Sequence, residues 1–408
     1  MWASAPRLML PAIGIVLIAA AGAPAGEFAP ALRAEYDLTK MWQIASDDDQ
    51  VTIGHIADAV SDDRGRLYLL DAQLCRVLVL NPSGSVAREI GREGEGPGEF
   101  RQPTSIAWWA GDTLAVSQGA IPGRITLLDT LGAFVRTIHY SRNGQQRVVG
   151  IRRLAPYSSG MYLETRVTRS DGTSTETITE LVRCDRNGAE MEVLRQQRER
   201  TTIKLYTLDE QALFVPWSEW AVLDDGFLVH RASRKEYRLR AVSPSGYEGD
   251  FAVRPYSTLS RDARDLERLR AAWLEDARRF FPDARVHLEE TEPDIVRVIA
   301  TAGGTLLVQT SRQERKSSGT TLLLADRYDV AGNRLGEVAY MTAQPEGLND
   351  IIFVSGDTVL ARHLVGPLGE PIDTAADCGG CSPVYVCYRA RLRRSEEHTS
   401  ELQSRVDI

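Results

Sequence analysis

The sequence predicts an all-β fold, a six-bladed β-propeller of four-stranded antiparallel blades, and two recurring turns carry this prediction. The first turn contains glycine, follows an apolar run and occurs six times, at Gly65, Gly111, Gly160, Gly226, Gly304 and Gly356. The second turn begins with Asp, Asn or Ser and ends in glycine three residues later. It occurs five times, at Gly84, Gly132, Gly188, Gly246 and Gly332. In such turns the first side chain caps the backbone and the glycine supplies the positive φ.

The difference between six and five copies predicts how the ring closes. If each unit is a four-stranded meander, the first turn joins its two inner strands and the second joins its two outer strands. The sixth unit then lacks an outer strand, which the N-terminal segment 31–45, ALRAEYDLTKMWQIA, can supply. We therefore expect this strand to close the last blade, since closure removes exposed sheet edges.

The interval between Gly246 and Gly332 is much longer than the others and contains a helical pattern. Pro282 ends this pattern, and its apolar residues recur at helical spacing: Leu266, Leu269, Trp273, Ala277 and Phe280. We predict a helical insertion over residues 257–281 whose apolar stripe packs on the propeller. A second insertion is expected at about residues 198–216, before the fourth blade.

Residues 1–25 have the features of a cleaved signal peptide. Arg7 precedes an apolar run, and Ala23-Pro24-Ala25 is a small-x-small cleavage pattern. A spanning helix is the alternative, but Pro11 interrupts the run. We expect a periplasmic or secreted protein with no stable membrane span after cleavage.

The propeller is expected to occupy residues 26–393. Residues 394–404, RSEEHTSELQS, match the translation of a common short-read sequencing adapter. We interpret residues 394–408 as an artefact of sequence assembly and expect this segment to be disordered.

A glycine-rich stretch at residues 90–103, IGREGEGPGEFRQP, allows two interpretations. Phosphate-binding loops lead from a strand into a helix, whereas this stretch leads to Pro103 and then into a predicted strand. It is therefore interpreted as a connection between blades.

The first repeat resembles NHL-repeat-like six-bladed propellers. The shared features are an Asp-x-x-Gly before LYLLD, an Arg-Val-x-Val strand, a Pro-x-Gly turn and the Gly-x-Gly-x-Gly-Glu-Phe-x-x-Pro loop. The resemblance is strong over residues 53–140. It implies kinship with secreted bacterial propellers that mostly lack an assigned activity.

Candidate site residues come from aligning the predicted innermost strands on their turn glycines. The position seven residues before each glycine is polar throughout: Asp58, Thr104, Arg153, Glu219, Arg297 and Asn349. We expect these residues to form a polar ring in the central funnel. The ring either binds a polar ligand or forms a plug in which the polar groups pair with one another. Lactonase-like propellers hold a metal with Glu, Asn and Asp. Here the positive charges of two arginines balance the negative charges of Asp58 and Glu219. A hard cation requires an excess of carboxylate oxygen. No metal or cofactor is therefore predicted.

No catalytic residue is assigned. The histidines are scattered, and no Gly-x-Ser-x-Gly motif occurs. The net charge of −8, without a purely basic cluster, argues against nucleic-acid binding.

The predicted function is an exported, monomeric, non-catalytic binding or scaffold protein. Its partner would be a polar small molecule, glycan, peptide or protein at the funnel face. The alternative is a lactonase-like hydrolase or lyase acting on a carbohydrate or lactone.

The cysteines of the DCGGC segment predict a disulfide. In an exported protein, Cys378 and Cys381 are expected to close a small loop, and Cys387 is an alternative partner.

Overall fold

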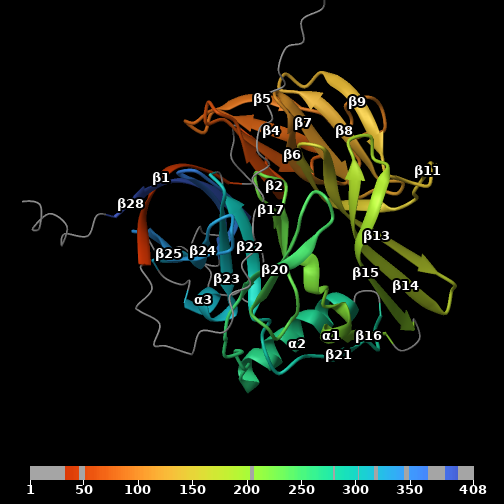
Figure 1. Ribbon diagram of the computed structural model, residues 1–408, viewed down its shortest axis with the longest axis vertical. Helices are drawn as coiled ribbons and strands as arrows, with labels where there is room; N and C mark the ends of the chain where they lie inside the picture. Colours follow the sequence, from red (N-terminus) through yellow and green to blue (C-terminus); the bar gives the residue numbers. More distant parts are fainter. Residues whose placement is uncertain are drawn as a thin grey trace, which may run out of the picture. The chain divides into compact units, whose positions relative to one another are not determined.

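The computed structural model describes residues 33–45, 51–202, 206–278, 281–301, 303–316, 320–343, 349–365 and 382–393. The fold is all-β and propeller-like, built mainly from four-stranded antiparallel sheets (Figure 1). Residues 1–25, 394–408, Cys378 and Cys381 lie outside the described residues. Within the described ranges, no helix is long and apolar enough to cross a membrane.

The first four sheets each contain four strands that pair in sequence order. Sheet 1 contains β2 (Ile56–Ser61), β3 (Leu67–Asp71), β4 (Arg76–Leu80) and β5 (Val86–Ile90). Sheet 2 contains β6 (Pro103–Ala110), β7 (Thr113–Gln118), β8 (Arg124–Asp129) and β9 (Phe134–His139). Sheet 3 contains β12 (Gly150–Tyr157), β13 (Gly160–Ser170), β14 (Ser174–Asp185) and β15 (Glu190–Thr202). Sheet 4 contains β17 (Trp220–Val222), β18 (Leu228–Arg231), β19 (Arg238–Val242) and β20 (Glu248–Val253).

The remaining strands form one eight-stranded sheet that consists of two groups of four. Sheet 5 is the group β22 (Ile295–Thr301), β23 (Thr305–Thr310), β24 (Thr321–Tyr328) and β25 (Arg334–Thr342). Sheet 6 is the group β26 (Asn349–Ser355), β27 (Thr358–Val365), β28 (Ser382–Leu392) and β1 (Arg33–Ala45). β1 pairs antiparallel with β28 and parallel with β25, which joins the two groups. The N-terminal strand therefore supplies the outer strand that the sixth unit lacks, as the turn count predicted.

The turn between β8 and β9 shows why the second repeated motif recurs. The Asp129 carboxylate accepts hydrogen bonds from the backbone N–H groups of Leu131 and Ala133, at 2.9 and 2.8 Å. Gly132 adopts a φ of +93°, a conformation that side-chain-bearing residues rarely take. The aspartate and the glycine therefore perform the two roles assigned to them from the sequence.

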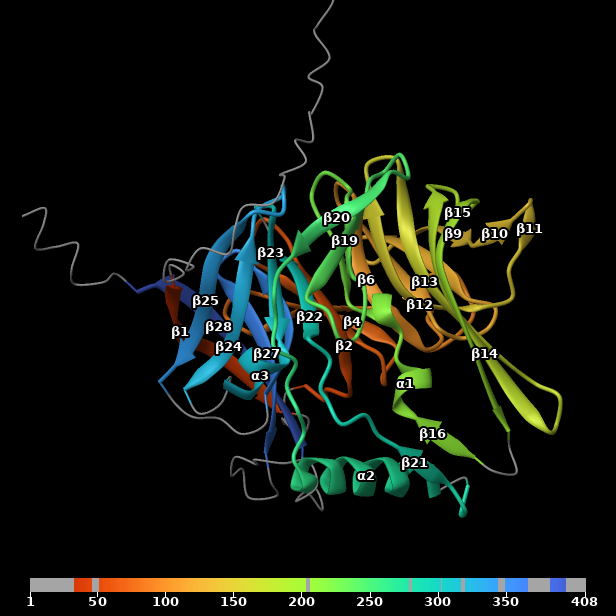
Figure 2. The same ribbon diagram turned by 60° about the horizontal axis from the view of Figure 1, so that its bottom comes forward.

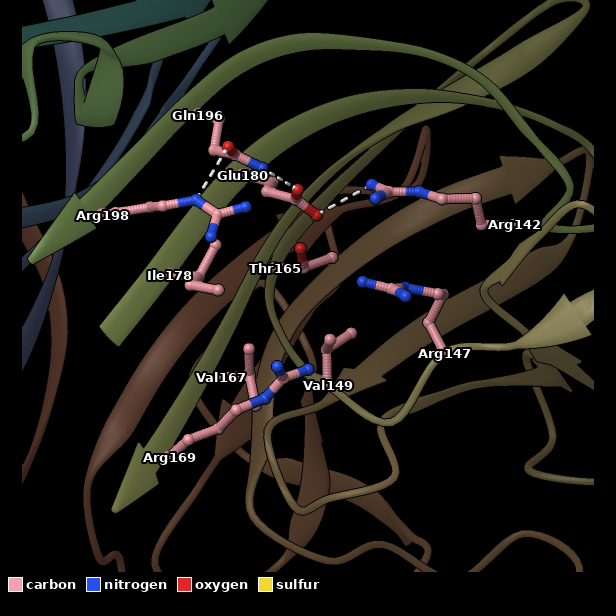
Figure 3. Close-up of a pocket in the computed structure, with 10 residues that line it drawn as sticks. All are labelled: Arg142, Arg147, Val149, Thr165, Val167, Arg169, Ile178, Glu180, Gln196 and Arg198. Atoms are coloured by element: carbon pink, nitrogen blue, oxygen red, sulfur yellow. Dashed lines mark hydrogen bonds and ion pairs between the residues drawn. The ribbon is translucent and has the colours of Figure 1, made fainter. Parts of the chain in front are cut away.

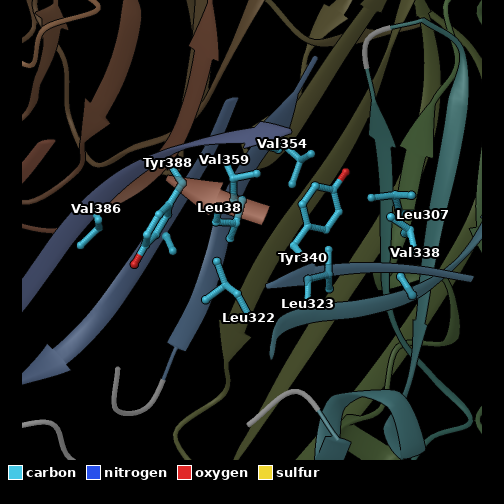
Figure 4. Packing of buried hydrophobic residues seen from close by; sticks show 13 residues of the cluster. Leu38, Leu307, Leu322, Leu323, Val338, Tyr340, Val354, Val359, Val386 and Tyr388 are labelled. Atoms are coloured by element: carbon cyan, nitrogen blue, oxygen red, sulfur yellow. The ribbon is translucent and has the colours of Figure 1, made fainter. Parts of the chain in front are cut away.

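The hydrophobic core lies between consecutive sheets. Within the described ranges, each of six buried apolar clusters joins one sheet to the next, and one of them joins sheet 6 back to sheet 1. In the cluster between sheets 5 and 6, Leu323 and Tyr340 pack against Val359 and Tyr388 (Figure 4). Burial of these side chains is the main favourable term for holding neighbouring sheets together.

The two predicted insertions form one small unit. It contains β16 (Thr207–Asp209), α1 (Glu210–Leu213), the 3-10 helix η2 (Pro216–Ser218), α2 (Ala263–Arg278) and β21 (Arg285–His287). β16 pairs parallel with β21, and Figure 2 shows these elements together with α2 at one edge of the molecule. β15 continues to Thr202, so the predicted start of the second insertion at residue 198 was too early. In α2, Ala277 is buried, whereas Leu266, Leu269 and Trp273 are half-buried.

A buried carboxylate ties this unit to sheet 4. Glu210 accepts hydrogen bonds from Arg234 at 2.7 Å, from Arg261 at 2.6 and 2.9 Å, and from the Glu289 backbone N–H at 2.9 Å. Burial raises the pKa of Glu210, but hydrogen bonds from Arg261 and Glu289 outweigh it and hold the pKa below its ordinary value. The carboxylate therefore remains ionised between its two arginines.

The short elements outside these groups are the hairpin β10 (Ser141–Arg142) and β11 (Gln145–Gln146), and the helix α3 (Ser311–Lys316).

The glycine-rich stretch is a packed connection from β5 to β6. Phe100 is fully buried; its N–H donates to the Arg92 carbonyl at 2.8 Å, and its carbonyl accepts from Gly94 at 3.0 Å. A Cβ on Gly91 would lie 2.3 Å from the Phe100 ring, so only glycine fits there. The glycines serve this close packing, which agrees with their interpretation as an inter-blade connection.

Candidate functional site

The predicted ring residues lie on or beside the innermost strands. Asp58 is in β2, Thr104 in β6, Arg153 in β12 and Arg297 in β22, while Glu219 directly precedes β17 and Asn349 begins β26. Each innermost strand contacts that of the next sheet, and β26 contacts β2. The side chain of Asn349 lies outside the part of the chain that the structure describes.

Most of these strands contain a β-bulge at the candidate position. The register shifts fall between Ile56 and Asp58, between Pro103 and Ser105, between Ile151 and Arg153, and between Ile295 and Arg297. In β26 the shift lies further along, between Ile351 and Phe353. Alignment on the turn glycines therefore misses the bulge in β26. In β2 the residue directly after the bulge is Asp58, and in β6 the equivalent residue is Ser105. The glycine alignment selects Thr104 in β6 instead.

Asp58 and Ser105 perform the same task in neighbouring sheets. The Asp58 carboxylate accepts hydrogen bonds from the N–H groups of Ile106 in β6, at 3.0 Å, and of Ala59, at 2.8 Å. The Ser105 hydroxyl accepts the N–H of Leu154 in β12 at 3.0 Å. Burial raises the pKa of Asp58 to about 6, although its two backbone hydrogen bonds and Arg153 oppose this rise. Each side chain links its innermost strand to the next.

The next candidates also contact a neighbouring sheet. The Arg153 guanidinium lies over the Trp220 ring of sheet 4, at 4.2 Å from its centroid. The Thr104 hydroxyl donates to the Ile151 carbonyl of sheet 3 at 2.7 Å. The Glu219 carbonyl accepts the backbone N–H of Arg231, whose side chain donates to the Ile295 carbonyl of sheet 5 at 2.7 Å. The structure thus brings Asp58 and Arg153 near each other, and it engages Asp58, Thr104 and Arg153 in contacts between sheets, whereas the contact of Glu219 lies within sheet 4. Arg297 is half-buried.

No group of three or more His, Cys, Asp or Glu side chains gathers to hold a metal within the described ranges. Three of the five cysteines lie in those ranges, and all three are buried free thiols: Cys75, Cys184 and Cys387.

A second candidate site, which we call the arginine cavity, lies on sheet 3. It has a volume of about 230 Å³ and is lined by ten residues (Figure 3). They are Arg142, Arg147, Val149, Thr165, Val167, Arg169, Ile178, Glu180, Gln196 and Arg198.

Strand register explains why these residues meet. Alternate residues of a strand face the same side of a sheet, which places Thr165, Val167 and Arg169 of β13 on one face. Opposite Thr165 lies Glu180, and opposite Glu180 lies Gln196. β13, β14 and β15 contain 11, 12 and 13 residues, so this face is long enough to form a wall of the cavity.

The opposite wall comes from the connection that enters sheet 3. Asn143 and Gly144 have φ values of +53° and +75° and form the two-residue turn of the β10–β11 hairpin. Because the strands alternate in direction, this connection reaches β12 at the same end of the sheet as the β13–β14 turn. The hairpin thereby brings Arg142 and Arg147 to the wall formed by β13.

Arg142 is held within a buried network. It donates to Glu190 at 2.7 Å and to Glu180 at 3.0 Å, and its guanidinium also bonds the Tyr140 hydroxyl at 3.2 Å. Gln196 donates to the second oxygen of Glu180, which is almost completely buried. These contacts neutralise Glu180 and fix the position of Arg142 at the cavity.

The other arginines leave positive charge in the cavity. Within the described ranges, the guanidinium groups of Arg147 and Arg169 make no hydrogen bond or ion pair, and the Arg147 Nε is buried without a partner. Arg198 lies 3.9 Å from Glu176 and donates to Gln196 at 3.2 Å. The arrangement is suited to an anion, because guanidinium groups bind carboxylates, sulfates and phosphates through two parallel hydrogen bonds.

Sequence reasoning missed the arginine cavity because its arginines do not recur in the repeats and are spread over three segments of the chain, at residues 142–147, 169 and 198. Two signals were available: the Asn-Gly turn at residues 143–144 and the unusual length of the strands between Gly160 and Gly188. Neither indicates that the hairpin folds against β13.

Comparisons with known proteins bear on the fold. Residues 47–108 match a family model described as a 6-bladed beta-propeller (DUF5128), which confirms the resemblance to six-bladed propellers. No curated protein matches.

Similar solved structures include three bacterial proteins. A member of the DUF4221 family from Bacteroides vulgatus is 9% identical, with a TM-score of 0.42, over 88% of this chain and 99% of that one. Virginiamycin B lyase from Staphylococcus aureus is 9% identical, with a TM-score of 0.37, over 86% and 99%. Regucalcin, a calcium-binding protein from Agrobacterium tumefaciens, is 12% identical, with a TM-score of 0.36, over 88% and 98%. Similarity at this level carries no information about the activity of this chain.

Proposed function

We propose that this chain, which resembles six-bladed β-propellers, is an exported, non-catalytic binding protein that takes a small polar ligand in the arginine cavity. Export is supported by the apolar N-terminal run after Arg7 and by the cleavage pattern at residues 23–25. The observation that carries the binding role is the cavity itself, where polar side chains of three strands and one hairpin converge.

We further propose that sheets 1 to 6 are six blades around one axis, with β1 closing the last blade. Two observations support this layout. The buried apolar clusters join each sheet to the next and sheet 6 to sheet 1. The innermost strands contact one another in the same cyclic order. In this layout the inner-strand residues Asp58, Ser105 and Arg153 act as links between blades, which leaves ligand binding to the cavity at the rim.

A thermal-shift screen on the full chain tests the binding role. A ligand at a hundredfold excess over its dissociation constant stabilises the folded state by about 2.7 kcal/mol. Val167→Trp should fill the cavity and abolish the response to any ligand found in a panel of sugars, lactones, peptides and organic acids. Thr168→Trp is the matched control, because neighbouring residues of β13 face opposite sides of the sheet. A ligand response that survives Val167→Trp would place the binding site elsewhere.

The alternative, a lactonase-like hydrolase or lyase acting on a carbohydrate or lactone, is favoured by one observation. The pKa of Asp58, raised by burial to about 6, suits a group that exchanges protons near neutral pH. Lactone and glycoside hydrolysis should then be detectable and should be lost in Asp58→Asn. Equal turnover by the wild type and this variant would remove the support for the alternative.

A further inference from the structure

We infer that the ligand of the arginine cavity is a small organic anion, bound through Arg147 and Arg169, whose carbon skeleton lies on Val149, Val167 and Ile178. This inference rests on the proposed binding function and specifies its ligand.

The charge of the cavity supports an anion. Four arginines and one glutamate line the cavity, and the glutamate is paired with Arg142. Arg142 also pairs with Glu190, so this part of the wall carries no excess positive charge. Arg147 and Arg169 supply charge that no described carboxylate balances. The cations of Arg147 and Arg169 border the same small space and repel one another, and an anion between them would relieve this repulsion.

The position of Arg147 supports direct contact with the ligand. Its Nε is shielded from solvent and has no hydrogen-bond partner. Eight other arginines in the described ranges have such an Nε, so it is the location of Arg147 in the cavity wall that points to a ligand. In Figure 3 the side chains of Arg147 and Arg169 approach the cavity from different walls, with Val149 between them and Val167 beside Arg169. An oxyanion placed there would satisfy Arg147 and balance its charge.

The size and the apolar wall restrict the ligand further. The volume of about 230 Å³ lies below the range of about 300–1,000 Å³ that is common for drug-sized ligands, so a small acid fits better than a polymer. Val149, Val167 and Ile178 cannot hydrogen-bond an inorganic ion, but they can cover a carbon skeleton. Thr165 and Gln196 add polar groups beside this wall. The ligand is therefore expected to combine an acidic group with an apolar part.

Binding can be measured by calorimetry with pairs of probes that differ in charge. Benzoate is compared with benzyl alcohol, glucuronate with glucose, and inorganic sulfate serves as a bare oxyanion, all at constant ionic strength. We expect at least one organic anion to bind about tenfold or more tightly than its neutral counterpart and than sulfate, because a charge-assisted pair with arginine is lost in the neutral probe. Affinity should fall as salt increases.

Variants separate this inference from the proposed function. Arg147→Gln and Arg169→Gln should each weaken binding of the anion about tenfold or more. Arg152→Gln, which changes an exposed arginine of the same sheet outside the cavity, should leave it unchanged. Circular dichroism would verify that each variant is folded. If a neutral probe binds as tightly as its anion, or if Arg147→Gln binds normally, the anion inference is wrong while the binding function stands. If no probe binds and the screen also finds none, both fail.

Discussion

Replacing Asp58 by asparagine should change how stability depends on pH. In the folded chain the pKa of Asp58 is about 6, against 3.8 for an ordinary aspartate, because burial disfavours its charged form. The folded state therefore holds the proton more tightly than the unfolded state. The resulting stabilisation is complete below about pH 4 and is lost as the pH rises through 6. Asparagine does not ionise, so this dependence should be absent in the variant.

The magnitude follows from the shift of about two units. At about 1.36 kcal/mol per unit, the upper limit is roughly 3 kcal/mol. The side chain is partly exposed, so solvent screening should reduce the effect to about 1–2 kcal/mol. Between pH 4 and pH 7.5, the free energy of unfolding of the wild type should fall by this amount relative to that of Asp58→Asn.

Urea unfolding at a series of pH values, followed by tryptophan fluorescence, measures this difference. Asp63→Asn, which removes an exposed aspartate in the following turn, controls for the general loss of a negative charge. If the free energy of unfolding depends on pH in the same way in the wild type and in Asp58→Asn, the reasoning is refuted. If the wild type gains stability relative to the variant as the pH rises, the pKa of Asp58 is lowered in the folded state and not raised.

Two further predictions concern the elements that complete the fold. Trp42→Ala in β1 should destabilise the protein by about 3–5 kcal/mol in urea unfolding, because the ring is buried between sheets 6 and 1; a loss below about 1 kcal/mol would mean that β1 contributes little to closure. Glu210→Gln should cost about 3–5 kcal/mol, since it leaves the buried Arg234 without a carboxylate partner, while Arg261 keeps Glu292. Glu267→Gln, on the exposed side of α2, should be neutral, and an equal effect of the two changes would contradict this role of Glu210.

Local chemistry made much of the fold predictable. The Asp-x-x-Gly turns act through contacts within five residues, so their positions and their glycine conformations could be predicted from residues such as Asp129 and Gly132. The count of turns then predicted that residues 31–45 pair in the last sheet, because a four-stranded unit must be completed. The helical insertion was predictable from apolar spacing, although its helix begins at Ala263 and not at the predicted residue 257. Its join to the segment at Thr207–Asp209 was not predictable.

The candidate sites were less predictable, because they depend on register and on contacts between distant segments. A single bulge moves every following side chain to the other face of a strand. For this reason the glycine alignment selected Thr104 instead of Ser105 and missed the bulge of β26.

The sequence by itself therefore determined the repeat, its turns and the strand that completes the last unit, since these follow from short-range patterns. Only the tertiary structure decided what the polar residues do. Asp58 and Ser105 link neighbouring sheets, and Arg147 and Arg169 meet across one cavity. The physical reason is that the pKa and the contacts of an ionisable side chain depend on its burial and on its neighbours. Both are set by segments that lie far apart in the chain.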